Sequence, residues 1–117
     1  MEAISYIVQP MEIKPTVLVV DDEEGARQSL EVILEDDYQV LSAGSGQEAL
    51  GILQKLPVDV ILLDVNMPKM DGLEVLRKVK EQEEGIDVIM VSALDMARKA
   101  VDAIKLGAYD YITKPYE

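Results

Sequence analysis

Apolar and polar residues alternate along the chain in blocks that predict strands and helices in regular succession. The run Thr16–Val20 is apolar and rich in β-branched residues, which is typical of a strand buried on both faces. Between Ala26 and Leu34 the apolar residues recur at helical spacing, as in a helix that packs one face against a core. The two patterns then repeat as far as residue 113. Such an alternation predicts an α/β domain in which helices cover a parallel sheet.

The later blocks predict the remaining strands and helices. The strands are expected at Tyr38–Ala43, Val58–Leu63, Ile86–Val91 and Tyr109–Thr113. The helices are expected at about Gln47–Lys55, along Leu73, Leu76 and Val79, and along Ala97, Ala100, Val101 and Ile104, with each apolar series facing the core. Ser45 and Asp71 are expected to cap two of these helices, and Glu48 is expected to complete a capping box with Ser45.

Polar side chains follow four of the predicted strands. Parallel α/β sheets bind ligands where the carboxyl ends of their strands meet. The residues that leave these ends are Asp21, Asp22, Asp64, Ser92 and Lys114. Each has an ordinary explanation, as a helix cap, a turn residue or a solvated charge. Their arrival at one edge from separate strands instead favours a functional site there.

The acidic residues of this edge need a positive partner. Two carboxylates about 4 Å apart repel by roughly 4 kcal/mol at an effective dielectric constant near 20. Lys114 supplies a single positive charge, which is insufficient for three aspartates. Carboxylate oxygens, waters and a substrate phosphate are the ligands that Mg²⁺ prefers. An aspartate beside such an ion can attack phosphorus and form an acyl phosphate.

The composition argues against several other kinds of chemistry. The chain has no cysteine and no histidine, which removes disulfides, serine-hydrolase triads and most zinc sites. Its net charge of −12 disfavours direct binding to nucleic acid phosphates. No apolar run approaches the roughly 18 residues that a membrane span needs, and the acidic start is unlike a signal peptide. These features predict a cytoplasmic protein.

Four sequence motifs resemble those of the receiver domain of two-component response regulators. They are V-L-V-V-D-D at 17–22, L-L-D-V-N-M-P-K-M-D-G at 62–72, V-S-A at 91–93 and Y-I-T-K-P at 111–115. The resemblance covers residues 16–117 and leaves residues 1–15 as an arm outside the domain. It implies a doubly wound, five-stranded parallel sheet with the flavodoxin-like strand order 2-1-3-4-5.

The resemblance also implies roles for individual residues in the chemistry. Asp64 matches the phosphoacceptor of the family. Asp22 matches the direct Mg²⁺ ligand, and Asp21 matches the acidic neighbour that acts through water. Asn66 matches the position whose backbone carbonyl completes the metal site, and Lys114 matches the lysine that binds the phosphoryl group.

Two further residues match the conformational switch of receiver domains. Ser92 corresponds to the hydroxyl that moves toward the phosphoryl group, and Tyr111 to the aromatic residue that turns inward behind it. Tyr109 competes with Tyr111 for the second role. The implied function is to take a phosphoryl group from a sensor histidine kinase or a phosphotransfer protein and to change conformation, which controls an output. Such a domain catalyses its own phosphorylation and dephosphorylation, without being a conventional turnover enzyme.

The carboxyl end of the chain departs from the family pattern. Receiver domains finish with a fifth helix, whereas this sequence stops at Glu117, soon after the K-P turn. A sheet without that helix would expose apolar strand surface, and such surface usually finds a partner. We therefore expect that the arm at 1–15 covers it, that a second copy of the chain does so by pairing or exchange, or that the natural protein is longer.

Two alternative functions compete with this interpretation. A phosphatase or phosphotransferase of the haloacid dehalogenase type also uses a nucleophilic aspartate and Mg²⁺. Its D-x-D motif follows the first strand, whereas the run Asp64-Val65-Asn66 follows the third. The other alternative is a receiver-like interaction scaffold that is never phosphorylated, which the complete acidic set, Ser92 and Lys114 oppose.

Overall fold

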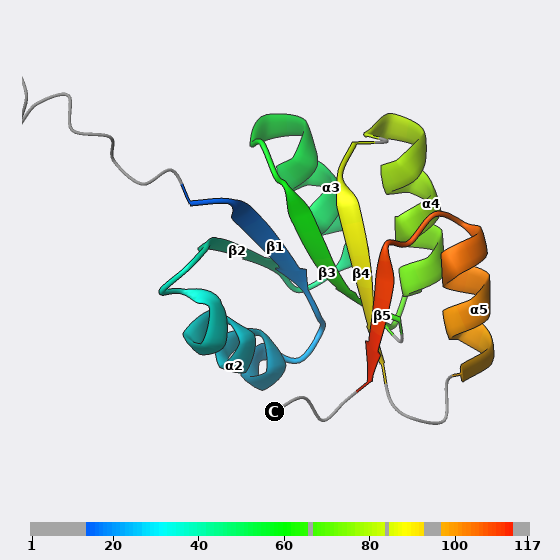
Figure 1. Ribbon diagram of the computed structural model, residues 1–117, viewed down its shortest axis with the longest axis horizontal. Helices are drawn as coiled ribbons and strands as arrows, with labels where there is room; N and C mark the ends of the chain where they lie inside the picture. The colour runs from blue at the N-terminus through cyan, green and yellow to red at the C-terminus, as the bar shows by residue number, and fades with distance from the viewer. Residues whose placement is uncertain (1–13, 66, 84, 93–96, 114–117) are drawn as a thin grey trace, which may run out of the picture.

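The computed structural model describes residues 14–65, 67–83, 85–92 and 97–113, and within these ranges strands and helices alternate as predicted (Figure 1). The strands are β1 (Thr16–Val20), β2 (Gln39–Ala43), β3 (Val60–Asp64), β4 (Asp87–Ser92) and β5 (Asp110–Thr113). The helices of the described residues are α2 (Glu24–Leu34), α3 (Gly46–Lys55), α4 (Gly72–Gln82) and α5 (Ala97–Lys105). None of these helices combines the length and the apolarity needed to cross a lipid bilayer.

The strands form one parallel sheet in the order β2-β1-β3-β4-β5, which confirms the predicted order. Helix α2 lies on one face of the sheet, and α3, α4 and α5 lie on the other (Figure 1). The chain leaves β1 toward β2 and leaves β3 toward β4, so the two loops diverge from the central β1–β3 pair. Loops that diverge in this way open a crevice at the carboxyl ends of the two strands.

Strand β1 is buried on both faces, as its continuous apolar run predicted. Leu18 and Val20 belong to the larger core cluster, on the side of α3, α4 and α5. Val17 and Val19 pack with Leu30 of α2 on the opposite face. Successive side chains of a strand point to opposite faces, so each face of β1 contributes to a core. The two cores together hold the end of β1, and therefore the acidic pair that follows it, in a fixed place.

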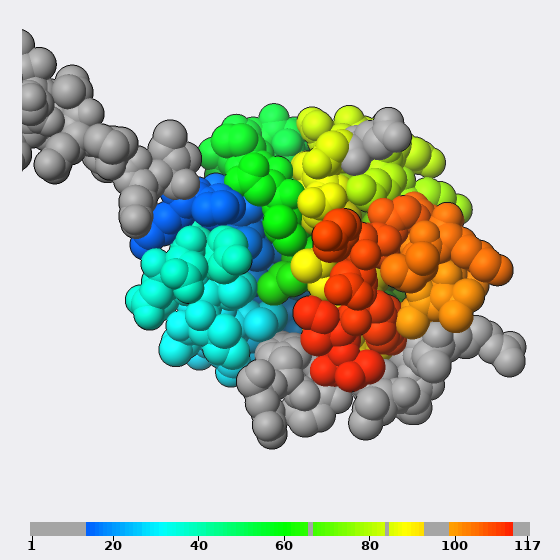
Figure 2. Space-filling model, in the orientation of Figure 1, coloured from blue at the N-terminus to red at the C-terminus, as the bar shows by residue number. Residues whose placement is uncertain are grey.

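The face that α2 covers is partly open beside β4 and β5. Figure 2 shows β3 and β4, in green and yellow, at the surface between α2 in cyan and β5 in red. Ile89 of β4 is half-buried, and Ile112 of β5 is 39% exposed. Among the described helices, α2 alone lies on this face. The arm at 1–15 was one of the segments expected to cover this surface, and residues 1–13 of it lie outside the described ranges.

Helix α5 turns a different side toward the core from the one predicted. Val101 is 55% exposed and Ile104 is 50% exposed, whereas Ala103 is fully buried in the larger core cluster. The prediction followed the bulk of the apolar residues, but two overlapping apolar stripes run along this helix. The stripe that contains the small Ala103 packs into the core instead. Ile33 of α2, predicted on a core face, is likewise 58% exposed.

Helix α3 begins at a serine cap, as predicted, but its capping box is altered. The hydroxyl of Ser45 accepts a hydrogen bond of 3.1 Å from the backbone N–H of Glu48. In a standard capping box the Glu48 side chain would bind the N–H of Ser45. Here its Oε2 instead accepts from the N–H of Gly44, at 3.2 Å. The glutamate therefore ties the helix to the preceding turn, which lies at the edge of the sheet where the site is expected.

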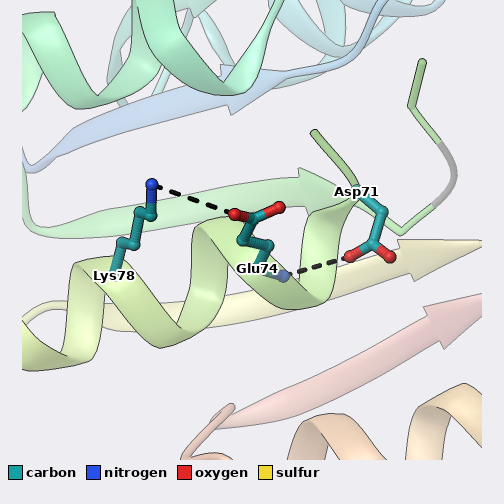
Figure 3. A network of polar contacts seen from close by, with 3 residues as sticks. All are labelled: Asp71, Glu74 and Lys78. Carbon is teal, nitrogen blue, oxygen red and sulfur yellow. Dashed lines mark hydrogen bonds and ion pairs between the residues drawn. The ribbon is translucent and has the colours of Figure 1, made fainter. Parts of the chain in front are cut away.

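Helix α4 begins at the predicted aspartate cap (Figure 3). Asp71 Oδ1 accepts a hydrogen bond of 3.1 Å from the N–H of Glu74. The side chain of Glu74 also faces Lys78 one turn later, with 3.9 Å between Oε1 and Nζ. These contacts fix the start of α4, and with it the end of the loop that follows β3.

Candidate functional site

The three predicted acidic residues meet at the carboxyl ends of the two central strands. Asp21 and Asp22 follow β1, and Asp64 is the last residue of β3. Each contributes one carboxylate oxygen to a group in which all the oxygens lie within 4.8 Å of one another. The residues come together because β1 and β3 pair in parallel, with Val20 opposite Leu63. Residues that are some 40 positions apart in sequence thereby end at the same edge.

The backbone of each strand end is held by hydrogen bonds to its neighbour. The N–H of Asp21 donates to the carbonyl of Ala43 at the end of β2, at 3.1 Å. Beyond Asp64, the N–H of Val65 donates to the carbonyl of Val91 in β4, at 3.0 Å. The ladder thus continues one residue further than the sequence pattern indicated, and Asp64 belongs to the strand itself. The alternative explanation of Asp64 as an ordinary turn residue after the strand is therefore wrong.

The residue that caps α2 is not Asp22. The N-terminal cap position is occupied by Glu23, whose side chain makes no capping hydrogen bond. Asp21 Oδ1 accepts a hydrogen bond of 3.0 Å from the N–H of Glu23. The explanation of Asp22 as a helix cap is therefore wrong, and its carboxylate is exposed at the mouth of the cluster.

The electrostatics of the cluster favour a hard cation. Asp21 is 3% exposed and Asp64 is 7% exposed, so both carboxylates are largely withdrawn from water. At a separation of 4.8 Å, two unit charges repel by about 3.5 kcal/mol at an effective dielectric constant of 20. All the converging groups are oxygen ligands, and one of the three residues, Asp22, is exposed to solvent. This set fits the preferences of Mg²⁺.

The loop after β3 folds back closely onto the strand end. The N–H of Gly72 donates to the carbonyl of Val65 at 2.8 Å. A Cβ at this glycine would lie 2.3 Å from the backbone oxygen of Asp64 and 2.7 Å from Cα of Val65. Within the loop, Lys69 adopts a positive φ of 68°, which a residue with a side chain takes up rarely. This close approach means that Gly72 shapes the loop.

Ser92 and Tyr111 lie on neighbouring strands and contact each other through their hydroxyl groups. Ser92 is 1% exposed and is the last residue of β4. Tyr111 is half-buried and packs against the larger core cluster, while Tyr109 is 70% exposed. Of the two aromatic residues, Tyr111 is the one that reaches Ser92.

Two predicted site residues lie outside the described ranges. These are Asn66, after β3, and Lys114, after β5. One residue near the cluster was not anticipated from the sequence: Arg27 of α2 donates a hydrogen bond from Nη1 to the backbone carbonyl of Asp21, at 2.6 Å. Its only sequence signal is its position about one helical turn after the acidic pair, which many surface arginines share.

Comparison with known proteins agrees with the fold. Residues 17–117 match the family model of the response regulator receiver domain. The chemotaxis protein CheY of Halobacterium salinarum is 36% identical over 102 residues, which make up 86% of this chain and 85% of that protein. The crystal structure of the chemotaxis protein CheY4 of Vibrio cholerae has a TM-score of 0.84 and 34% identity, with 89% of each chain covered.

Other relatives are considerably longer than this chain. The alkaline phosphatase synthesis transcriptional regulatory protein PhoP of Bacillus subtilis is 41% identical over 101 residues, which are 86% of this chain but 42% of that protein. The chain spans 22% of the regulatory protein AtoC of Escherichia coli, at 33% identity over 86% of its own length. The similarity to these relatives therefore concerns one part of each of them.

Proposed function

Because the chain belongs to the family of response regulator receiver domains of two-component systems, we propose that it accepts a phosphoryl group on Asp64 with the help of a bound Mg²⁺. The observation that carries this proposal is the meeting of three carboxylates within 4.8 Å at the ends of β1 and β3. The family membership also disfavours the haloacid dehalogenase alternative.

Asp21, Asp22 and Asp64 would hold the ion, and the backbone carbonyl of Asn66 would add a further oxygen ligand. The ion supplies positive charge that offsets the charge of the transferred oxygens. Lys114 would contribute a second positive charge on the same group. The buried strands β1 and β3 would hold the Asp64 carboxylate at a fixed position, so that little reorganisation is needed when the phosphoryl donor arrives.

In the proposed transfer, a carboxylate oxygen of Asp64 forms a bond to the phosphorus of a phosphohistidine while the P–N bond breaks. The electron pair of that bond returns to the imidazole, which leaves neutral because its other nitrogen carries a proton. The donor would be a sensor histidine kinase or a phosphotransfer protein. Later attack by water on the acyl phosphate would restore the carboxylate and release inorganic phosphate.

The contact between Ser92 and Tyr111 supports a role for this pair in signalling. Ser92 lies on β4, which pairs with the strand that carries Asp64, and Tyr111 lies on β5, on the other side of β4. A phosphoryl group on Asp64 would offer a charged acceptor to the Ser92 hydroxyl, which now contacts Tyr111. If the Ser92 hydroxyl left Tyr111 for the phosphoryl group, the position of the Tyr111 side chain and the surface of β5 would change. Two alternative arrangements of this kind are what a phosphorylation switch requires.

The decisive experiment is the labelling of Asp64→Asn with acetyl phosphate and Mg²⁺, followed by intact-mass measurement. Asp37→Asn is the matched control, because Asp37 is an exposed aspartate between α2 and β2, away from the cluster. The unchanged protein and the control are expected to gain the mass of one phosphoryl group, and Asp64→Asn none. Labelling of Asp64→Asn to the same extent would refute the assignment, and absence of labelling in all three proteins would favour an unphosphorylated scaffold.

A further inference from the structure

Arg27 reaches back from α2 to the turn that carries the acidic pair. Its Nη1 donates a 2.6 Å hydrogen bond to the backbone carbonyl oxygen of Asp21. The side chain is half-buried, and in the part of the chain that the structure describes it makes no ion pair. A guanidinium placed beside several carboxylates would ordinarily pair with one of them. This one binds a backbone carbonyl, so its placement calls for an explanation other than charge pairing.

The same guanidinium lies against a second turn at the edge of the sheet. A Cβ at Gly44 would be 3.3 Å from Nη1 of Arg27 and 3.7 Å from its Cζ. The N–H of Gly44 is bound by the Glu48 side chain at 3.2 Å, so this turn is itself anchored to α3. Arg27 therefore joins the turn after β1 to the turn after β2.

Asp22 depends on its backbone for its orientation. Its carboxylate is exposed and makes no hydrogen bond to the described residues. The carboxylate of Asp21, in contrast, is held by the N–H of Glu23. The carbonyl of Asp21 and the N–H of Asp22 belong to one planar peptide group. A donor that holds that carbonyl oxygen therefore holds the plane of this peptide group and the Cα of Asp22, from which the side chain extends.

From these contacts we infer that Arg27 is a positioning residue, which holds the peptide between Asp21 and Asp22 so that the Asp22 carboxylate points into the metal site. The inference rests on the proposed Mg²⁺ function of that site. It predicts that replacement of Arg27 changes the Mg²⁺ affinity in the direction opposite to that expected from charge alone. Removal of a positive charge beside a cation site should tighten cation binding, because the repulsion between them is lost. Loss of the positioning contact should weaken it.

The test is a titration of Arg27→Met with MgCl₂, followed by the chemical shifts of backbone amides in NMR spectra. We expect the dissociation constant to rise about tenfold, the equivalent of about 1.4 kcal/mol. Arg77→Met is the control for charge, since Arg77 is exposed on α4 and its replacement changes the net charge equally. The control is expected to bind Mg²⁺ as the unchanged protein does, or slightly more tightly. Equal or tighter binding by Arg27→Met would overturn the inference.

A second pair of variants keeps Arg27 and tests whether the position of its guanidinium matters. Gly44→Ala brings a methyl group to 3.3 Å from Nη1, so the guanidinium must move by a few tenths of an ångström. We expect this variant to bind Mg²⁺ two- to fivefold more weakly, by the same physical reason. Gly51→Ala adds a methyl group with no atom within 4 Å and should leave the affinity unchanged. Unchanged binding by Gly44→Ala would contradict the positioning role even if Arg27→Met did not fold.

The two proposals fail in different ways in this experiment. If the unchanged protein shows no saturable shifts with MgCl₂, the proposed metal site is wrong and the role of Arg27 falls with it. If the unchanged protein binds Mg²⁺ and both Arg27→Met and Gly44→Ala bind it equally well, only the role of Arg27 is refuted.

Discussion

Gly72 shows how tightly the backbone is packed around the proposed phosphoacceptor. The distances of 2.3 Å and 2.7 Å from its absent Cβ to backbone atoms of Asp64 and Val65 leave no space for a methyl group. Backbone atoms of a buried strand cannot move aside as the end of a flexible side chain can. The glycine is thus required for a close approach, and its φ is not in the positive range.

We expect Gly72→Ala to lower the free energy of unfolding by about 2–3 kcal/mol, in the range of other overpacked sites. Urea denaturation measures this value directly. Gly51→Ala in α3, where a methyl group meets nothing within 4 Å, should instead raise stability by about 0.5–1 kcal/mol, because alanine is the better helix former. A Gly72→Ala variant as stable as the unchanged protein would show that the loop relaxes away from β3.

A second prediction at this scale concerns the repulsion among the acidic residues. In Asp21→Asn one charge is lost, while the Oδ1 that accepts from the N–H of Glu23 is retained. We expect the variant to be about 1 kcal/mol more stable than the unchanged protein without metal, since part of the repulsion between buried charges is removed. At a Mg²⁺ concentration a hundred times the dissociation constant, the unchanged protein should gain about 2.7 kcal/mol.

The variant should gain much less from Mg²⁺, because one of its oxygen ligands has lost its charge. Thermal unfolding with and without MgCl₂ measures both effects in one series. Asp37→Asn, an exposed aspartate outside the cluster, serves as the control and should respond to Mg²⁺ as the unchanged protein does. An equal Mg²⁺ effect in Asp21→Asn would argue that Asp21 takes no part in binding the ion.

At the scale of the elements, α5 illustrates what periodicity leaves open. Its sequence contains two overlapping apolar stripes, and the heavier stripe, with Val101 and Ile104, faces solvent. The small Ala103 is buried in the larger core cluster instead. A hydrophobic pattern indicates that a helix is amphipathic. Which of two neighbouring apolar stripes is buried depends on the shape of the surface against which the helix packs.

This orientation can be tested with one substitution on each side of α5. Ala103→Asp buries a charge among apolar side chains, and we expect it to destabilise the fold by more than 3 kcal/mol. Val101→Asp places the same charge at a position that is 55% exposed, where surface substitutions usually change stability by about 0.5 kcal/mol or less. The midpoints of thermal unfolding give the comparison. Equal losses at the two positions would mean that α5 is rotated relative to the arrangement described.

At the scale of the whole molecule, the net charge of −12 acts on the compact state. The excess of like charges favours expansion, and dissolved salt screens it. The crowding of three carboxylates at one edge adds a local repulsion that a divalent ion relieves by direct binding. Monovalent and divalent salts should therefore stabilise the molecule by different routes.

We expect the midpoint of thermal unfolding to rise gradually with NaCl, between about 0.05 M and 0.5 M, because the Debye length falls over this range. MgCl₂ at matched ionic strength should raise it further, and the additional part should saturate. In Asp21→Asn the additional part should be reduced while the response to NaCl remains. A response to Mg²⁺ that merely follows ionic strength would indicate screening without a site.

The sequence alone determined the succession of strands and helices, the class of fold and the residues at the edge of the sheet. These follow from local patterns, since a strand with two buried faces and an amphipathic helix each have their own periodicity. Asp21, Asp22 and Asp64 could be chosen because parallel strands end at a common edge, whatever the details of packing. The motifs then pointed to a phosphoacceptor site.

Only the tertiary structure decided the contacts between segments distant in the chain. The exposure of Val101, the close approach of Gly72 to Asp64 and the contact of Tyr111 with Ser92 are examples. The same holds for Arg27, whose bond to the Asp21 carbonyl has no signature in the sequence. Periodicity reports the direction of a side chain relative to its own element, whereas these contacts depend on the distance and angle between elements. Those quantities are set by packing of the whole core.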